Sequence, residues 1–243
     1  MEWEHKCSLA WLQERQGHLT ASEVRTLIPL TRTGRRRTIT NEDYMRVFAN
    51  KCVNLTEEDC WSHGAAARGH ILEPYAIDAL NDWLDAEGID EEFFWWDDKL
   101  VVDGFRSLAF SPDAMDIPMI QVLPKPTALA EVKSYGAERH LTTACTPKNL
   151  IEERWQIATA MAVLDSIDHA YLTLFNPSMN DYRLIVIRFD RSELYSEIDT
   201  VLEAENEWDE FLKSVNLLYP HAGYGQDEEL IVEEYIERQK LNP

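Results

Sequence analysis

The sequence predicts an α/β (α+β) domain, and three observations lead to this prediction. With 243 residues and a hydrophobic content of 45%, the chain is long and apolar enough to bury one sizeable core. Segments with the apolar spacing of helices occur together with short apolar runs that are typical of strands. The sequence contains no internal repeat and no low-complexity linker, so we expect one domain over residues 1–220 and an acidic appendage over 221–243.

Three helices are expected in the first part of the chain. Residues 20–23 have the form of a capping box, so a helix is predicted to begin there and to end before Pro29. Residues 31–40 are expected to form a basic loop, after which a second helix runs through Asn50. The pattern over residues 62–87 predicts a third, longer helix.

Strands are expected mainly after residue 90. The short apolar or alternating runs 93–96, 99–102 and 108–110 predict an antiparallel meander, and residues 128–133 predict a further strand. The remaining expected elements are a helix over 148–164, strands over 171–175 and 184–189, and a helix over 192–218.

The residues with the clearest chemical meaning are Asp113, in a Ser-Pro-Asp sequence, and the Glu-Val-Lys sequence of residues 131–133. Glu131 and Lys133 flank one apolar residue of the expected strand, so they point to the same face. Two carboxylates can hold Mg²⁺, while a lysine can orient a water and offset developing charge, which suits phosphodiester hydrolysis. The alternatives are a turn-capping aspartate and a solvent-facing Glu–Lys pair.

Five separated motifs occur in one order along the chain. They are residues 11–24 (WLQERQGHLTASEV), residues 69–74 (GHILEP), residues 111–113, residues 131–133 and Gln156. In this order, over about residues 11–190, the chain resembles the phage λ exonuclease (YqaJ-type viral recombinase) family of PD-(D/E)xK nucleases. The resemblance implies a restriction-endonuclease-like core, with a central mixed sheet flanked by helices. It also implies a Mg²⁺-dependent 5′→3′ exonuclease that degrades double-stranded DNA ends to mononucleotides, for recombination by single-strand annealing.

The resemblance further implies a metal and catalytic set. Asp113, Glu131, the backbone carbonyl of Val132 and Glu73 are expected to hold metal, and Lys133 completes the catalytic residues. A third carboxylate makes physical sense because two divalent ions need more negative charge than two carboxylates supply. Mg²⁺ is the expected ion, in two copies, with Mn²⁺ as the alternative. A solvated surface glutamate remains the alternative for Glu73.

The resemblance also implies two groups of DNA-contacting residues. The expected 5′-phosphate pocket consists of Arg15, Ser22, Ser111 and Gln156. Ser22 would lie in the first turn of its helix, where free N–H groups favour an anion. The residues expected to contact DNA elsewhere are Arg32, Arg35, Arg36 and Arg37. For the last three, a solvated charge run is the alternative.

The formal net charge of −21 is unusual for a DNA-binding protein, because affinity for phosphates comes mainly from Lys and Arg. More than half of the excess lies in residues 190–243, which carry fifteen acidic and four basic side chains. The resemblance implies a ring-shaped homotrimer that threads DNA, with a single-strand annealing protein as partner, and topology could then substitute for surface charge. Two alternatives stay open: an endonuclease of the same fold, and an acidic DNA mimic or interaction protein without enzymatic activity.

Composition also bears on location and cofactors. No apolar run approaches the length of a membrane span, and the N-terminus lacks a signal pattern, so we expect the cytoplasm of a bacterial or phage-infected cell. The four cysteines, Cys7, Cys52, Cys60 and Cys145, have no CxxC spacing, which argues against a zinc site. Some nucleases of the family that the chain resembles carry iron–sulfur cysteines after the catalytic core, but no cysteine follows Cys145, which argues against such a cluster. Buried free thiols are expected instead.

Overall fold

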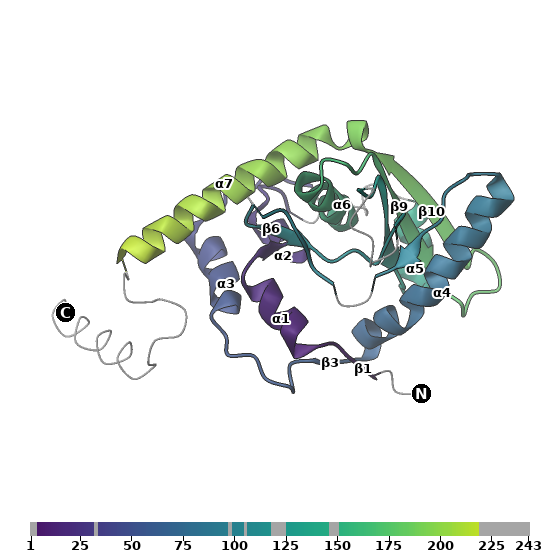
Figure 1. Cartoon of the computed structure of the whole chain (residues 1–243), viewed down its shortest axis with the longest axis horizontal. Helices are drawn as coiled ribbons and strands as arrows, with labels where there is room; N and C mark the ends of the chain where they lie inside the picture. Colours follow the sequence, from purple (N-terminus) through teal and green to yellow (C-terminus); the bar gives the residue numbers. More distant parts are fainter. Residues whose placement is uncertain are drawn as a thin grey trace. The chain divides into compact units, whose positions relative to one another are not determined.

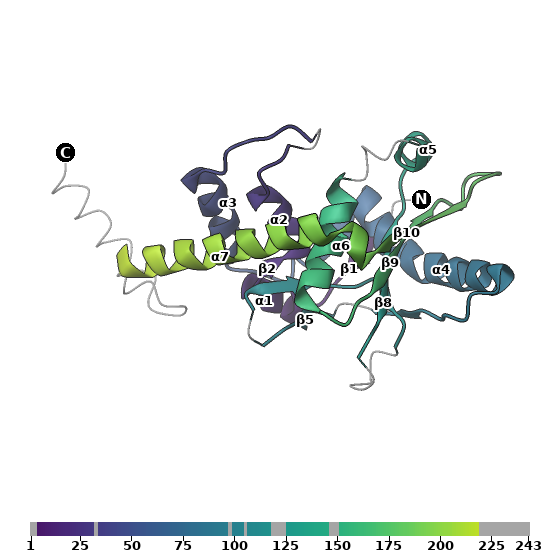
Figure 2. The ribbon, with the colours of Figure 1, turned by 90° about the horizontal axis from the view of Figure 1, so that it is seen from above.

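The computed structural model describes residues 4–31, 34–96, 99–104, 106–117, 125–145 and 151–218 (Figures 1 and 2). The chain divides into two compact units, residues 1–205 and residues 206–243. The boundary between them falls within the last described helix, α7 (Tyr195–Leu218). Residues 221–243 lie outside the described part, so the separate acidic appendage stays a prediction.

The first unit is built on a five-stranded sheet with the strand order β10-β9-β8-β7-β4. Its strands are β4 (Phe94–Trp95), β7 (Ala114–Met115), β8 (Ala128–Lys133), β9 (His169–Phe175) and β10 (Leu184–Asp190). Strands β8 and β9 run parallel, whereas the other neighbours are antiparallel, so the sheet is mixed. The connection from β8 to β9 contains α5 (Ala137–Cys145) and α6 (Ile151–Val163).

Helices cover this sheet, as the predicted fold class requires. In both views the sheet lies between α4 (Gly64–Glu87) and α6 (Figures 1 and 2). The buried face of α4 contributes Ala76, Ile77, Leu80 and Leu84 to a core that also contains Phe93, Ala114, Ala128, Ala130, Val132 and Tyr171. Burial of these apolar side chains is the main term that holds α4 on the sheet.

A second sheet corrects the predicted meander. It has the order β2-β6-β5, with β2 (Leu19–Thr20) parallel to β6 (Leu108–Phe110) and β5 (Val101–Val102) antiparallel to β6. Strand β4 pairs instead with β7 in the large sheet, so the three runs do not form one meander. All three residues of β6 are buried, and β6 has a neighbouring strand on each edge. One neighbour is β5 and the other is β2, which begins at residue 19.

The N-terminal helices are α1 (Leu9–Gln16), α2 (Ala21–Leu27) and α3 (Asn41–Lys51). The second and third begin where the capping residues predict, whereas α1 was not predicted. In α2 the Thr20 amide donates to Glu23 Oε2 at 3.0 Å, and in α3 the Thr40 amide donates to Asp43 Oδ2 at 3.0 Å. Both are capping boxes. The pair β1 (Glu4–Lys6) and β3 (Trp61–His63) and the helix α5 were not predicted.

The four cysteines are free thiols. Cys60 is buried, as expected, but Cys52 and Cys145 are exposed, so the expectation of buried thiols is wrong for these two. Among the described residues, no helix combines the length and the apolar character needed to cross a bilayer.

Glu205 holds the β6 segment in place and gives a first prediction. Its buried carboxylate accepts hydrogen bonds from the amides of Ser107 (2.8 Å) and Leu108 (3.2 Å) and from Arg106 Nη1 (3.2 Å). Glu205→Ala would leave these donors unpaired, so we expect it to lower the free energy of unfolding by about 2–4 kcal/mol in chemical denaturation. Glu203 is exposed and serves as the control, because Glu203→Ala should change the free energy of unfolding by less than about 0.5 kcal/mol. Equal effects of both substitutions would contradict this assignment.

Candidate active site

The large sheet brings the two halves of the acidic motif together. Ala114 of β7 pairs with Ala130 of β8 in antiparallel register, so Asp113 lies opposite Glu131. The amide of Val132 donates a hydrogen bond of 2.6 Å to Asp113 Oδ2. Pairing of β7 with β8 therefore closes the long sequence gap between the motifs and fixes the Asp113 side chain beside Glu131 and Lys133.

Lys133 and Glu131 form a partly buried ion pair at the end of β8. The Lys133 ammonium donates directly to Glu131 Oε1, and the side chains are 23% and 13% exposed. Burial alone would lower the pKa of Lys133, but the charges of Glu131 and Asp113 outweigh this effect and raise the pKa above its usual value. Lys133 therefore provides a fixed positive charge among carboxylates.

The pKa of Asp113 indicates that a third carboxylate lies nearby. Burial raises the pKa of Asp113 well above its usual value, and the charges of Glu131 and Glu73 raise it further. Lys133 and the Val132 amide act in the opposite direction. The other three residues predicted as catalytic thus lie within electrostatic reach of Asp113, so that three carboxylates accompany one ammonium. This excess of partly buried negative charge, carried by hard oxygen donors, fits a divalent cation such as Mg²⁺.

The side chains are not arranged as a finished set of metal ligands. Within the described ranges, no three His, Cys, Asp or Glu side chains are gathered closely enough to hold an ion. The contacts explain this: Glu131 Oε1 faces Lys133, Asp113 Oδ2 faces the Val132 amide, and Glu73 Oε1 lies 3.1 Å from His70 Nδ1. The ligand roles of Asp113, Glu131, Val132 and Glu73 therefore stay predictions.

Two neighbouring features were missed by sequence reasoning. His70 lies one turn before Glu73 on α4 and stacks on His5, with the ring centroids 4.6 Å apart. Its spacing of three residues from Glu73 is the signal that could have found it.

The second feature is Tyr135, which continues the period-two spacing of Glu131 and Lys133. Its hydroxyl donates to Glu153 Oε1 of α6, whose side chain is 1% exposed. Arg139 covers the Tyr135 ring, with Cζ 3.9 Å from the centroid, and donates to the hydroxyl at 3.2 Å. Burial, followed by the hydrogen bond to Glu153, raises the pKa of Tyr135, so its hydroxyl stays protonated.

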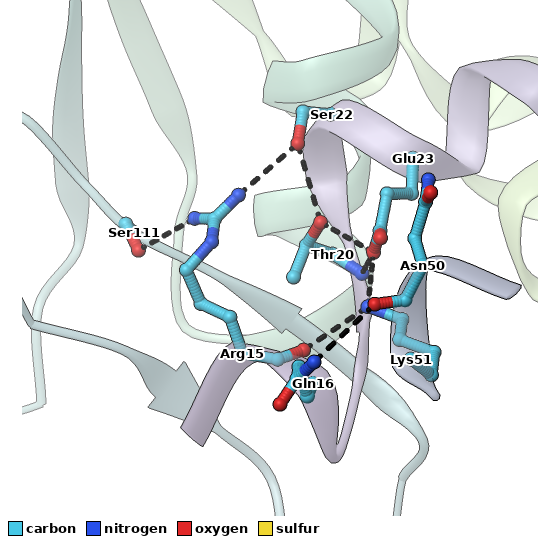
Figure 3. A network of polar contacts seen from close by, with 8 residues as sticks. All are labelled: Arg15, Gln16, Thr20, Ser22, Glu23, Asn50, Lys51 and Ser111. Atoms are coloured by element: carbon cyan, nitrogen blue, oxygen red, sulfur yellow. Dashed lines mark hydrogen bonds and ion pairs between the residues drawn. The ribbon is translucent and has the colours of Figure 1, made fainter. Parts of the chain in front are cut away.

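Three of the four residues predicted to bind a 5′-phosphate form one cluster (Figure 3). Arg15 of α1 donates to Ser111 Oγ at 3.3 Å and to Ser22 Oγ of α2 at 3.2 Å. The Trp11 indole also donates to Ser111 Oγ, at 3.2 Å, and its ring lies under the Arg15 guanidinium. The fourth residue, Gln156, lies on α6, the helix that packs against α2 and β6.

A buried lysine, which the sequence analysis did not single out, holds the backbone around this cluster in place. Lys51 of α3 donates to the Arg15 carbonyl at 3.0 Å and to Glu23 Oε2 at 2.5 Å (Figure 3). Glu23 also accepts from the Thr20 hydroxyl, which lies 3.2 Å from Ser22 Oγ. Burial lowers the pKa of Lys51, although the nearby Glu23 opposes this effect. The Arg15 backbone and the start of α2 are thus tied to one ion pair.

The basic loop contains arginines of different kinds. Arg32 lies outside the described residues. Arg35 and Arg36 are exposed, as a DNA-contacting loop would require. Arg37 instead donates to the carbonyls of Thr26 and Ile28 (3.1 Å to the second) and to Asp43 Oδ1 at 3.0 Å. Its guanidinium braces the loop against α2 and α3, a structural function that the sequence run did not indicate.

The structure has a mixed central sheet flanked by helices, which confirms the predicted α/β fold class. Comparison with family profiles finds no matching family, and comparison with curated proteins finds no match either. Among solved structures, the chain is similar to the alkaline exonuclease LHK-Exo from Laribacter hongkongensis, with a TM-score of 0.56 and 21% identity. The match covers 87% of this chain and 100% of that chain.

Two further solved structures are similar. LHK-Exo in complex with dAMP has a TM-score of 0.55 and 19% identity, covering 87% of this chain and 100% of that chain. A phage-related exonuclease from Haemophilus somnus 129PT has a TM-score of 0.49 and 13% identity, covering 82% and 96% of the two chains. The LHK-Exo matches establish the fold and agree with the family resemblance drawn from the motifs.

Proposed function

We propose that this protein is a divalent-metal-dependent nuclease that degrades double-stranded DNA from its 5′ ends to mononucleotides. The observation that best supports the proposal is the position of Asp113 beside the Glu131–Lys133 ion pair at the end of β8, with Glu73 of α4 within electrostatic reach of Asp113. A fold shared with an alkaline exonuclease supports it, as does the Arg15 cluster on the neighbouring elements.

The carboxylates and the lysine have separate tasks in this proposal. Asp113, Glu131, the Val132 carbonyl and Glu73 would hold Mg²⁺, in two copies, with Mn²⁺ as the alternative. When bound, such ions lower the pKa of a water and stabilise the leaving oxygen. Lys133, held beside Glu131, orients the attacking water and offsets negative charge at the phosphate. The Val132 amide keeps the Asp113 carboxylate turned toward β8.

The Arg15 cluster would select the 5′ end. A guanidinium with two hydroxyl groups, from Ser22 and Ser111, matches the charge and acceptors of a terminal phosphate. Gln156 would complete this pocket from α6. It lies three residues after Glu153, which accepts the hydrogen bond from the Tyr135 hydroxyl. A terminal phosphate fixed at one distance from the scissile bond gives both polarity and release of single nucleotides. Arg32, Arg35 and Arg36 would contact the duplex near the end being opened, and Arg37 shapes their loop.

Arg15→Gln is expected to remove the preference for 5′-phosphorylated ends. The rate of nucleotide release from phosphorylated duplex should fall by about 10–100-fold, because hydrogen bonds to charged groups contribute about 1.5–3 kcal/mol. The rate from 5′-hydroxyl duplex should change little. The measurement is release from the two substrates in parallel, with Arg188→Gln on the edge strand β10 as a charge-matched control. An equal loss on both substrates would contradict a 5′-phosphate function for Arg15.

Assembly and biological context belong to the same proposal. A homotrimeric ring around DNA would let a chain with a net charge of −21 keep its substrate without an open basic surface. The exposed 3′ strands would then be used for recombination by single-strand annealing, with an annealing protein as partner. This would take place in the cytoplasm of a bacterial or phage-infected cell. Light scattering after size exclusion tests the trimer, which requires three times the 28.2 kDa chain mass.

One experiment separates the proposal from its alternatives. A 5′-labelled linear duplex and a covalently closed circle are incubated with the protein and Mg²⁺. Loss of labelled mononucleotides from the linear duplex, with the circle intact, supports the exonuclease. Cutting of the circle favours an endonuclease of the same fold, and no cleavage of either substrate favours an acidic DNA mimic.

A further inference from the structure

An open cavity of about 370 Å³ adjoins the Arg15 cluster. Its lining residues are Ser22, Arg25, Thr26, Leu30, Arg37, Arg46 and Glu152. Three of these seven residues are arginines, in a chain with 23 basic and 44 acidic side chains. Ser22 belongs to both features, because its hydroxyl also accepts a hydrogen bond from Arg15. The cavity is therefore a locally basic space beside the proposed 5′-phosphate pocket.

Two of the arginines are held in place by the backbone around the cavity. Arg37 donates to the carbonyls of Thr26 and Ile28 and to Asp43. Arg25 Nη1 donates to the Leu30 carbonyl at 2.5 Å. A guanidinium has five N–H donors, so Arg37 retains donors beyond the three that it uses here. These contacts fix positive charge on the wall before any ligand arrives.

Arg46 differs from these two because its side chain is 68% exposed. It lies on α3, at 3.9 Å from Asp43, which is a loose ion pair. Glu152, which lines the cavity, and Asp43, which pairs with two of its arginines, already have cationic or backbone partners. Asp43 accepts from Arg37 and the Thr40 amide, and Glu152 lies 3.6 Å from Arg139. Arg46 is thus the arginine best able to turn toward an anion.

We propose that this cavity is a second phosphate-binding site, which holds a backbone phosphate of the bound DNA. The proposal rests on the proposed nuclease function and extends it beyond the terminal phosphate at Arg15. A phosphate in the cavity would meet the guanidinium of Arg46, with Arg25 and Arg37 behind it and the hydroxyls of Ser22 and Thr26 on the wall. Concentrating arginines in one cavity gives an acidic protein the phosphate affinity that its surface as a whole lacks.

The test measures binding of a short 5′-phosphorylated duplex by fluorescence anisotropy in EDTA, so that no cleavage occurs. Arg46→Gln should raise Kd about tenfold and reduce the slope of log Kd against log salt by about one. Arg188→Gln removes the same charge from the edge strand β10 and should leave both quantities unchanged. Unchanged binding by Arg46→Gln would overturn the proposal. Because this readout needs no catalysis, it is distinguishable from failure of the nuclease function, which is absence of nucleotide release by the wild type in Mg²⁺.

The source of the phosphate is found by neutralising one phosphate at a time. Duplexes with a single methylphosphonate linkage, placed at successive positions on either strand, are bound by the wild type and by Arg46→Gln. At the position seated in the cavity, the neutral linkage should weaken wild-type binding but not binding by the variant. That position identifies the strand. If no position behaves in this way, and free dAMP instead binds the wild type but not Arg46→Gln, the backbone assignment is overturned in favour of a mononucleotide site.

Discussion

Replacing Lys133 by alanine is expected to lower the rate constant for nucleotide release by about 10²–10⁴-fold. The Lys133 ammonium is partly buried and contacts Glu131 directly, so its charge lies beside the carboxylates that are proposed to hold metal. Its removal leaves Asp113, Glu131 and Glu73 without their nearest positive charge. A divalent cation should therefore bind at least as well to the variant, and the loss should lie in the chemical step.

Two measurements separate that explanation from simple unfolding. Single-turnover release from a linear duplex gives the rate constant, and the thermal shift caused by Mg²⁺ shows whether the ion still binds. Lys99→Ala, at an exposed lysine, is the matched control and should retain the wild-type rate. A Lys133→Ala variant that cleaves within about threefold of the wild type, well below the 10² expected from a general acid–base group, would remove Lys133 from the catalytic residues.

Asp113→Asn is expected to abolish activity while making the metal-free protein more stable. The Asp113 carboxyl is partly buried near Glu131 and Glu73, whose charges disfavour its ionised form. An amide at this position removes that repulsion, and its oxygen can still accept the hydrogen bond from the Val132 amide. For a domain of this size, a change of 1 kcal/mol in the free energy of unfolding shifts Tm by about 2–4 °C. We expect the Tm of metal-free Asp113→Asn to be higher than that of the wild type by about this amount.

In contrast to the stability of the metal-free protein, the stabilisation by Mg²⁺ should be smaller in Asp113→Asn than in the wild type. Wild-type protein should gain stability as Mg²⁺ is added, by about 2.7 kcal/mol at a concentration 100 times Kd, whereas Asp113→Asn should gain little. Calorimetry with and without Mg²⁺ measures both effects, and Asp78→Asn at an exposed position of α4 serves as the control. A variant with a lower Tm and an unchanged response to Mg²⁺ would show that Asp113 is a structural residue.

Local features of the fold could be predicted from the sequence because their partners are close in the chain. The capping boxes at Thr20 and Thr40 join residues three positions apart, and both begin helices as expected. Glu131 and Lys133 share one face because side chains alternate along β8. Pairing between distant segments was not predictable in this way. The predicted meander was wrong because β4 pairs with β7, and nothing near residue 19 indicates that it adds a strand to β6.

The candidate site shows the same division between local and distant information. The Arg15 cluster was expected only because a family resemblance linked Arg15, Ser22 and Ser111, and the structure brings their side chains together. Lys51 carries no sequence signal, since its contacts with Glu23 and the Arg15 carbonyl depend on how α3 packs. The sequence run 35–37 also gave no indication that Arg37 braces the loop while its neighbours are exposed.

The most direct test of the proposed metal centre is the anomalous scattering of Mn²⁺ in crystals of the protein. We expect a peak at about 2.0–2.6 Å from carboxylate oxygens of Asp113 and Glu131, with Glu73 in the same coordination sphere or bonded to its water. Saturating Mn²⁺ that produces no peak beside Asp113, or a peak only at other carboxylates, would contradict a nuclease centre at this end of the sheet.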